Sequence, residues 1–293
     1  MRTLTLVVTE ALAGRDIKSL LQREMRISES LTRRLKLRET GIMLNGHRAF
    51  TTARVKTGDV LTAEIGDAPD APRPKPMPAA LPVLYEDEDI LILNKPAGLA
   101  VHQSTRDPEE LTLENALAAY LPPEDFPHPV SRLDRGTTGV ITFAKNGYMH
   151  ELLRQQLHTA GFYREYRGIA CGNVESGSGS ISSPIGLAEN STYKRAVRAD
   201  GAPSLTEYEV LARKNGFTLL RLIPHTGRTH QLRVHMASLG HPLAGDWLYG
   251  ERHPHIERPA LHSHLLHLRH PLTGAVLDIT APLPEDMANL LQE

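Results

Sequence analysis

The feature that most constrains the fold of this chain is a proline-rich segment at residues 67–82, DAPDAPRPKPMPAALP. It carries six prolines and few side chains that could fill a hydrophobic core. Proline fixes φ and lacks a backbone N–H, so such a segment does not enter a regular helix or a central strand and instead runs semi-extended. We therefore expect a linker between two domains, residues 1–66 and residues 83–285. An irregular loop within a single domain is the alternative.

The first domain is expected to contain a strand, two helices and a hairpin. The helical spacing of Leu31, Leu35 and Leu37 predicts that these side chains face inward. Asn45 and Gly46 form a dipeptide that strongly predicts a two-residue hairpin turn. This domain holds 12 Lys and Arg against 7 Asp and Glu, a net charge of +5, whereas the whole chain has −1. The charge is therefore unevenly distributed, and the first domain is the part that would attract a polyanion.

Basic side chains gather on the second helix and the hairpin of this domain. They are Arg33, Arg34, Lys36, Arg38 and Arg48. Such a cluster predicts contacts with RNA phosphates, which position a protein on RNA without reading its bases. A solvated helix face with no ligand is the alternative.

The second domain shows more strands than helices, in an irregular order. Strand-like segments occur at residues 83–95, 139–146, 163–172, 204–224 and 275–282, and helical segments at 111–121, 148–158 and 229–240. This order predicts an α+β fold with a mixed, largely antiparallel sheet flanked by helices.

The composition narrows the cellular setting. The single cysteine, Cys171, excludes a disulfide framework and a cysteine-based metal site and fits a reducing cytoplasm. No apolar run approaches the length of a membrane span, and the N-terminal residues lack a signal-peptide pattern. We expect a cytoplasmic protein with no membrane partner.

The stretch SRLDRGTTGV, residues 131–140, places Asp134 between Arg132 and Arg135 just before an apolar strand. Neighbouring cations favour the ionised carboxylate, which suits a nucleophile or a base. The glycines that follow allow another backbone or a ligand to approach closely. An ordinary surface ion pair is the alternative.

A second polar stretch lies at a turn-to-helix junction within residues 222–250. It holds Arg228, His230, Gln231, Arg233 and His235 within eight positions. Polar groups at a helix N-terminus suit the binding of an anion. A metal site is the alternative, but two histidines five positions apart do not share one helical face. The histidines between 253 and 270 also lack acidic or cysteine partners at ligand spacing, so we expect no metal.

The second domain resembles the RluA-like family of pseudouridine synthases over almost its full length. The resemblance rests on LYEDEDILILNKPAGLAVHQS, SRLDRGTTGVITFAK, YREYRGIACG and HTGRTHQLRVHMASLGHPLAGDWLYG, in the family's order. Residues 1–66 are similar to the S-four-like RNA-binding module that often precedes this domain. The chain departs from the family pattern at Ser131, where histidine is common.

The resemblance implies a role for each site residue. Asp134 would be the catalytic carboxylate, acting at the ribose after a uridine has been flipped out of the RNA. Arg233 would pair with Asp134, and Tyr166 would stack on the target base and could relay a proton. Arg132 would occupy the space left by the flipped nucleotide, and Leu232 would line the uracil pocket.

The same resemblance implies the reaction. The uracil detaches, turns, and rejoins the ribose through its carbon 5, which requires no metal or nucleotide cofactor. Arg228 would touch phosphate or shape the motif. We expect an isomerase acting on structured RNA, with ribosomal RNA as substrate and the protein as a monomer. The alternatives are a tRNA substrate, a non-catalytic RNA-binding or ribosome-assembly protein, and a metal-dependent hydrolase.

Overall fold

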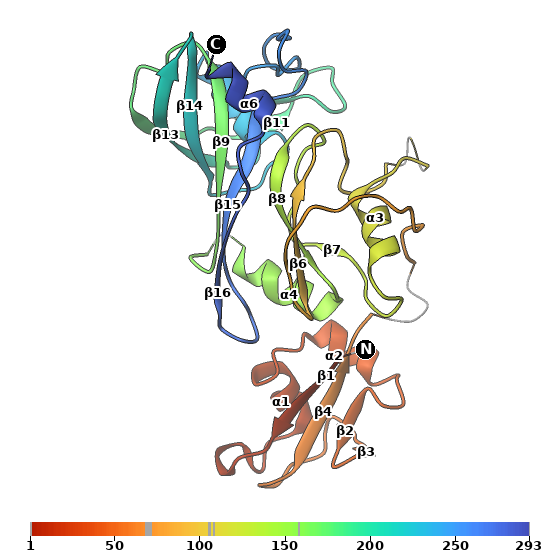
Figure 1. The fold of residues 1–293 in the computed structure, drawn as a ribbon. Coiled ribbons are helices and arrows are strands. Elements are labelled where there is room, and N and C mark those ends of the chain that lie inside the picture. The colour runs from red at the N-terminus through yellow and green to blue at the C-terminus, as the bar shows by residue number, and fades with distance from the viewer. Residues whose placement is uncertain (1, 68–71, 105–106, 108, 158, 293) are drawn as a thin grey trace.

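The computed structural model describes residues 2–67, 72–104, 107, 109–157 and 159–292. Figure 1 shows an elongated molecule, with a small N-terminal unit at one end and a larger body that holds the remaining elements. Residues 72–82 of the proline-rich segment form no helix or strand, and residues 68–71 lie outside the described part of the chain. The described part of this segment runs against the larger body, where the Asn115 side chain donates to the Lys75 carbonyl.

The N-terminal unit is a four-stranded antiparallel sheet with helices packed against it. Its strands, in the order β1-β4-β2-β3, are β1 (Arg2–Val7), β4 (Val60–Ile65), β2 (Ile42–Leu44) and β3 (His47–Arg48). The helices are η1 (Glu10–Leu12), α1 (Ile17–Arg23) and α2 (Glu29–Leu35). Asp16 and Ser28 begin α1 and α2 by accepting backbone N–H bonds, as short polar side chains do at helix N-termini.

The structure contains the predicted Asn45-Gly46 turn but does not bury Leu37 as predicted. Asn45 and Gly46 adopt positive φ of 53° and 79°, the conformation that a two-residue hairpin turn requires. Leu31 and Leu35 are buried, but Leu37 is 85% exposed, so its predicted inward position is wrong. The reason is that α2 ends at Leu35, and beyond that residue the helical spacing no longer decides which side chains face the core.

The larger body is built on one ten-stranded sheet. Eight strands follow the order β10-β13-β14-β9-β15-β8-β6-β5, while β16 pairs with β15 and β7 with β8. The strands are β5 (Val83–Glu86), β6 (Ile90–Lys95), β7 (His128–Pro129), β8 (Thr138–Ala144), β9 (Phe162–Cys171), β10 (Ser178–Ser182), β13 (Leu205–Lys214), β14 (Phe217–Pro224), β15 (Leu261–Arg269) and β16 (Val276–Thr280). Among the described residues, the pairings are antiparallel except that of β15 with β8. The expected α+β fold with a mixed, largely antiparallel sheet is confirmed.

In the described part of this body, four helices and a small hairpin pack around the sheet. They are α3 (Leu113–Tyr120), α4 (Gly147–Gln156), α5 (Gln231–Ser238), α6 (Glu285–Leu290), and the hairpin of β11 (Ile185–Leu187) with β12 (Arg195–Val197). Figure 1 places α4 between the sheet and the N-terminal unit. Tyr148 and Leu152 of α4 join the N-terminal core, and the Tyr148 hydroxyl donates to the Met25 carbonyl at 2.7 Å. Within the described part of the chain, no helix is long and apolar enough to cross a membrane.

Candidate active site

The loop that carries Asp134 is fixed by the strand that follows it. Thr137 donates its backbone N–H to the Asp134 carbonyl at 3.0 Å, and β8 begins at the next residue. Gly139 has a φ of 104°, and a side chain there would overlap the Ser263 carbonyl group of β15. Glycine is therefore required for β8 and β15 to pair in parallel, and this pairing sets the loop against the centre of the sheet.

A buried lysine supports the same loop from β6. Lys95 is fully buried, and its ammonium donates to the carbonyls of Pro96, Leu99 and Arg135 at 2.7–2.9 Å. Burial lowers the pKa of Lys95 to about 7, against the opposing influence of the Asp134 charge. These three hydrogen bonds connect the turn after β6 to Arg135, the residue next to Asp134. Sequence reasoning treated this lysine only as the end of a strand.

The central ion pair of the site joins Asp134 to α5. Nη1 of Arg233 lies 3.2 Å from Oδ2 of Asp134, while its Nε and Nη2 donate to Asp246 at 2.7 and 2.8 Å. Asp246 is fully buried, and 28% of the Asp134 side chain is exposed. Burial alone would lower the pKa of Arg233, but the hydrogen bonds and charges of Asp246 and Asp134 raise it. The guanidinium is thus a permanent cation. Its two hydrogen bonds to Asp246 fix its orientation, and its third nitrogen faces Asp134.

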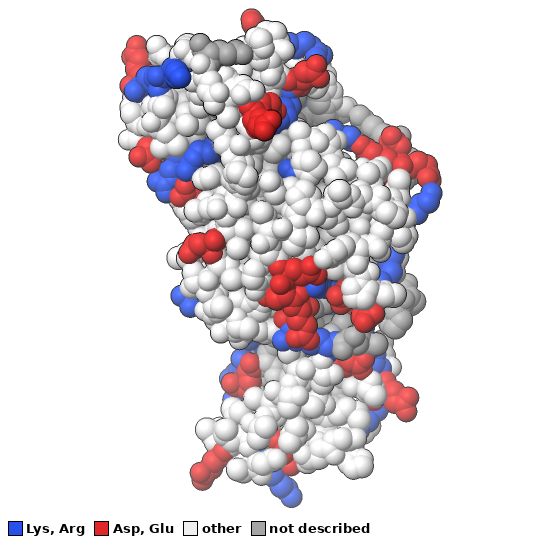
Figure 2. All heavy atoms as spheres, viewed as in Figure 1, with Lys and Arg blue, Asp and Glu red and all other residues white. Residues whose placement is uncertain are grey.

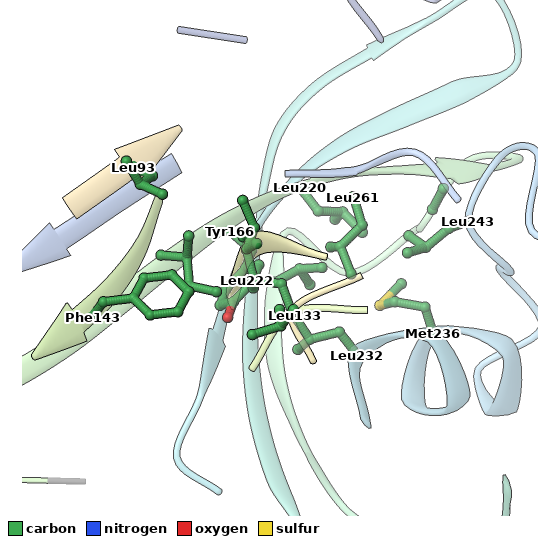
Figure 3. Packing of buried hydrophobic residues seen from close by; sticks show 14 of the residues in the cluster. Leu93, Leu133, Phe143, Tyr166, Leu220, Leu222, Leu232, Met236, Leu243 and Leu261 are labelled. Carbon is green, nitrogen blue, oxygen red and sulfur yellow. The ribbon is translucent and has the colours of Figure 1, made fainter. Parts of the chain in front are cut away.

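A cleft of about 690 Å³ opens in front of Asp134. Its apolar lining includes Leu133, Tyr166, Leu232 and Leu261, which belong to the main core cluster (Figure 3). Among the described residues that line the cleft, Asp134 is the single acid. The arginines that line it are Arg132, Arg135, Arg154, Arg164, Arg228 and Arg233. The cleft therefore combines an apolar floor, one carboxylate and a strongly cationic rim.

The structure brings together the residues that the sequence analysis assigned to catalysis and substrate binding. Asp134, Tyr166, Arg233, Arg132, Leu232 and Arg228 all line this cleft. Tyr166 and Leu232 are both 6% exposed, whereas Arg132 and Arg228 are exposed at the rim.

His230, Tyr249 and Arg195 form a network that reaches Asp134 and that the sequence analysis did not predict. Nε2 of His230 lies 3.9 Å from Oδ2 of Asp134, and its Nδ1 lies 2.8 Å from the Tyr249 hydroxyl. That hydroxyl accepts the backbone N–H of Arg195, on β12, at 2.9 Å. The density of polar residues around position 230 and the GDWLYG stretch are the sequence signals for this network. Neither signal shows that His230 pairs with Tyr249.

The predicted RNA-binding residues lie on the N-terminal unit and outside the cleft. Arg33, Arg34 and Lys36 are exposed on or next to α2, and Arg33 pairs with Glu29 at 3.0 Å. Arg38 donates to the carbonyls of Glu64 and Gly66, and Arg48 donates to that of Lys36. Figure 2 shows one face of the molecule, on which acidic side chains gather just above the junction with this unit.

One group of side chains among the described residues could hold a metal ion. Asp87, Asp89 and His270 offer ligand atoms within 4.8 Å of one another, but Arg2 already pairs with Asp89, and His270 lies 3.3 Å from Asp87. The group does not line the cleft. Other C-terminal histidines have different partners, such as His264 with the Ala281 carbonyl and His267 with Asp278.

Comparison with known proteins identifies the family to which the chain belongs. Residues 89–238 match the family model for RNA pseudouridylate synthases. The chain belongs to this family, and it is an isomerase that converts uridine to pseudouridine in RNA.

Individual relatives cover almost the whole chain. The uncharacterized RNA pseudouridine synthase YhcT of Bacillus subtilis is 35% identical over 99% of this chain and 96% of its own length. The ribosomal large subunit pseudouridine synthase D of Escherichia coli strain K12 is 35% identical over 86% of this chain and 82% of its own. A solved structure, human RNA pseudouridylate synthase domain containing 1, has a TM-score of 0.58 and 26% identity, covering 70% of this chain and 86% of that chain.

Proposed function

We propose that Asp134 is the catalytic carboxylate of this synthase. Two observations together carry the assignment. Asp134 is the single acid among the described residues of the cleft, and it pairs with Arg233, whose orientation is fixed by the buried Asp246. A guanidinium hydrogen-bonded to a carboxylate keeps it ionised and oriented. Asp134 then acts at the ribose, the N1–C1′ bond breaks, and C5 joins C1′. The C5 proton leaves and N1 gains one.

The apolar floor of the cleft supports a uracil-binding role. Leu232 and Leu133 provide apolar walls, and Tyr166 provides an aromatic face with a hydroxyl at its end. A base within a duplex cannot reach a floor this deeply buried, so the target nucleotide must leave its stack. Arg132 is exposed at the rim and fills the space that the nucleotide leaves. Tyr166 stacks on the uracil and relays a proton.

The cationic rim supports contact with the RNA backbone around the target. Arg154 on α4, Arg164 on β9 and Arg228 before α5 approach the cleft from three different elements. Phosphates on both sides of a flipped nucleotide could therefore be held at once. Such contacts position the RNA, and the uracil pocket selects the base.

The N-terminal unit is proposed to be an S-four-like RNA-binding domain of residues 1–66, joined by the segment 67–82 to a catalytic domain of residues 83–285. Its net charge of +5 and its exposed Arg33, Arg34 and Lys36 support this role. Phe50, which is 84% exposed, adds an aromatic surface suited to stacking on an unpaired base. We infer that Arg38 and Arg48 contribute less, because both already donate to backbone carbonyls.

The proposed substrate is ribosomal RNA of the large subunit, as in the Escherichia coli relative that is 35% identical to this chain. The protein would act as a monomer in the cytoplasm, where its single cysteine stays reduced. No cofactor is needed, because the reaction exchanges a C–N bond for a C–C bond without a change of oxidation state.

The test of substrate class is tritium release from RNA labelled at carbon 5 of uridine. The wild-type protein is incubated with free large-subunit ribosomal RNA, with large-subunit precursor particles and with bulk tRNA, and Asp134→Asn is the control on each. Release from either ribosomal substrate that vanishes in Asp134→Asn supports the proposal. Release from tRNA alone overturns the ribosomal assignment, and release that persists in Asp134→Asn overturns the catalytic assignment.

A further inference from the structure

The two donors beside Asp134 converge on one of its two oxygens. Arg233 Nη1 lies 3.2 Å from Oδ2, and His230 Nε2 lies 3.9 Å from the same atom. Oδ1 accepts no hydrogen bond from any residue described in the structure and belongs to a side chain that lines the cleft. Oδ2 of Asp134 is therefore fixed by its neighbours, whereas Oδ1 is available to a ligand in the cleft. His230 lies on the side of Oδ2.

The backbone and the ring of His230 are both fixed. The residue adopts a left-handed conformation with a φ of 57° at the N-terminus of α5, and 16% of its side chain is exposed. Its ring meets that of Tyr249 edge-on at a centroid distance of 5.7 Å. Left-handed backbone costs energy for a non-glycine residue, so this orientation must be stabilised by its surroundings.

Tyr249 decides which nitrogen of His230 carries the proton. Its hydroxyl accepts the Arg195 N–H and has one proton of its own to give, and His230 Nδ1 is 2.8 Å away. If Nδ1 carried the proton, the tyrosine proton would have no acceptor among the described residues, and Nε2 would present a lone pair to a carboxylate. The other tautomer removes both conflicts. Tyr249 therefore donates to Nδ1, and Nε2–H faces Asp134.

The surrounding charges are consistent with a neutral imidazole. Burial lowers the pKa of His230, with Asp134 and Asp246 opposing this effect and Arg233 and Arg195 adding to it. Burial also raises the pKa of Tyr249, so its hydroxyl keeps the proton that it donates.

We propose that His230 is a positioning residue for the isomerisation: set as the Nε2–H tautomer by Tyr249, it donates to Oδ2 of Asp134 and leaves Oδ1 for the ribose of the target uridine. The 3.9 Å separation shortens to a hydrogen bond when RNA fills the cleft, since hydrogen bonds of this kind tighten in the substrate complex. The proposal rests on Asp134 being the catalytic carboxylate. It adds a network that runs from the β11–β12 hairpin through Arg195 and Tyr249 to the reacting atoms.

Three variants separate positioning from folding. Tyr249→Phe removes only the hydroxyl, His230→Gly removes the side chain while suiting the left-handed backbone, and His230→Gln restores an amide N–H near the position of Nε2. At saturating RNA we expect single-turnover rates about 10-fold lower for Tyr249→Phe and about 100-fold lower for His230→Gly, with RNA dissociation constants unchanged. His230→Gln should recover much of the rate. His225→Gln, an exposed histidine of the preceding loop, is the matched control and should have the wild-type rate.

The tautomer is measured directly by long-range proton–nitrogen NMR on protein labelled with nitrogen-15 in its histidines. The His230 signals, assigned by their loss in His230→Gln, should show a proton on Nε2 in the wild-type protein and a mixture of tautomers in Tyr249→Phe. A proton on Nδ1 in the wild-type protein, or wild-type turnover in both Tyr249→Phe and His230→Gly, overturns the inference. If Asp134→Asn also keeps its turnover, the proposed function fails as well. If Asp134→Asn is inactive, only the role of His230 is lost.

Discussion

Arg233 and Asp134 are 99 residues apart in the chain, yet Nη1 of the guanidinium lies 3.2 Å from Oδ2 of the carboxylate. The same guanidinium makes two further hydrogen bonds to Asp246, which is fully buried. One cation is therefore shared by a buried carboxylate that fixes its position and a partly exposed carboxylate that faces the cleft. The planar, forked geometry of arginine allows this sharing, because its nitrogens point in different directions.

Arg233→Lys tests the shared geometry. A lysine ammonium is a point charge that cannot hold Asp246 through two hydrogen bonds and still reach Asp134, so we expect turnover to fall about 100-fold with RNA binding retained. Arg221→Lys is the matched control, since Arg221 also bridges two carboxylates, Glu165 and Glu209, but does not line the cleft. Equal single-turnover rates for the two variants would contradict the account.

Lys95→Met tests the support of the catalytic loop. The variant removes the buried ammonium that donates to the carbonyls of Pro96, Leu99 and Arg135, and we expect the free energy of unfolding, measured in urea, to fall by about 3 kcal/mol or more. Lys145→Met should lose about 1 kcal/mol or less, because its partner Glu86 is partly exposed and can be solvated. Equal losses in the two variants would count against a structural role for the three hydrogen bonds of Lys95.

His262 gives a prediction for pH. It is fully buried between the Thr138 hydroxyl and the Ala281 carbonyl, and burial lowers its pKa from 6.5 to about 4. Because the folded pKa is depressed, the unfolded chain binds the proton first as pH falls. This group therefore leaves stability unchanged above pH 6.5 and lowers the free energy of unfolding by up to about 3 kcal/mol between pH 6.5 and 4.

The measurement for His262 is a series of urea denaturation curves from pH 7.5 to 5. His262→Gln keeps an N–H for the Ala281 carbonyl and cannot titrate, so its stability should depend less steeply on pH, whatever its absolute value. Parallel pH dependences for the wild-type protein and this variant would show that His262 titrates normally in the folded state.

Charge reversal at Arg33 and Arg34 tests the N-terminal unit. If these arginines contact phosphates, the double Glu variant should bind RNA more weakly at low salt, and its log–log salt dependence should become shallower by about 1 to 2 units. Lys214→Glu, on an exposed hairpin of the larger body, controls for net charge. An unchanged salt dependence in the double variant would mean that the basic cluster is only a solvated helix face.

Features that depend on local backbone chemistry could be predicted from the sequence. Asn45 and Gly46 form the expected hairpin turn, because asparagine tolerates a positive φ and glycine adopts one without steric cost. Asn215 and Gly216 form a second turn of this kind, between β13 and β14. The largely antiparallel sheet was predicted from the irregular order of strand-like and helical segments along the chain. Leu37 shows where such predictions fail. Because α2 ends at Leu35, helical spacing no longer predicts which side chains beyond it face the core.

Features that depend on pairing between distant segments could not be predicted. Asp246 lies within a recognisable stretch, yet nothing local shows that its carboxylate is buried behind Arg233. Tyr249 and Arg195 meet only because the β11–β12 hairpin folds back onto α5. Arg38 was grouped with phosphate-binding residues but donates to Gly66, since β4 ends beside it.

The most direct test of the central claim compares the wild-type protein with Asp134→Asn in a single-turnover tritium-release assay on C5-labelled ribosomal RNA. Asparagine keeps the shape of the side chain but cannot act as a nucleophile or base. We expect tritium release to be lost, while the RNA dissociation constant and the melting temperature stay near those of the wild type. Release by Asp134→Asn within 10-fold of the wild-type rate would show that the carboxylate in this cleft does not carry out the isomerisation.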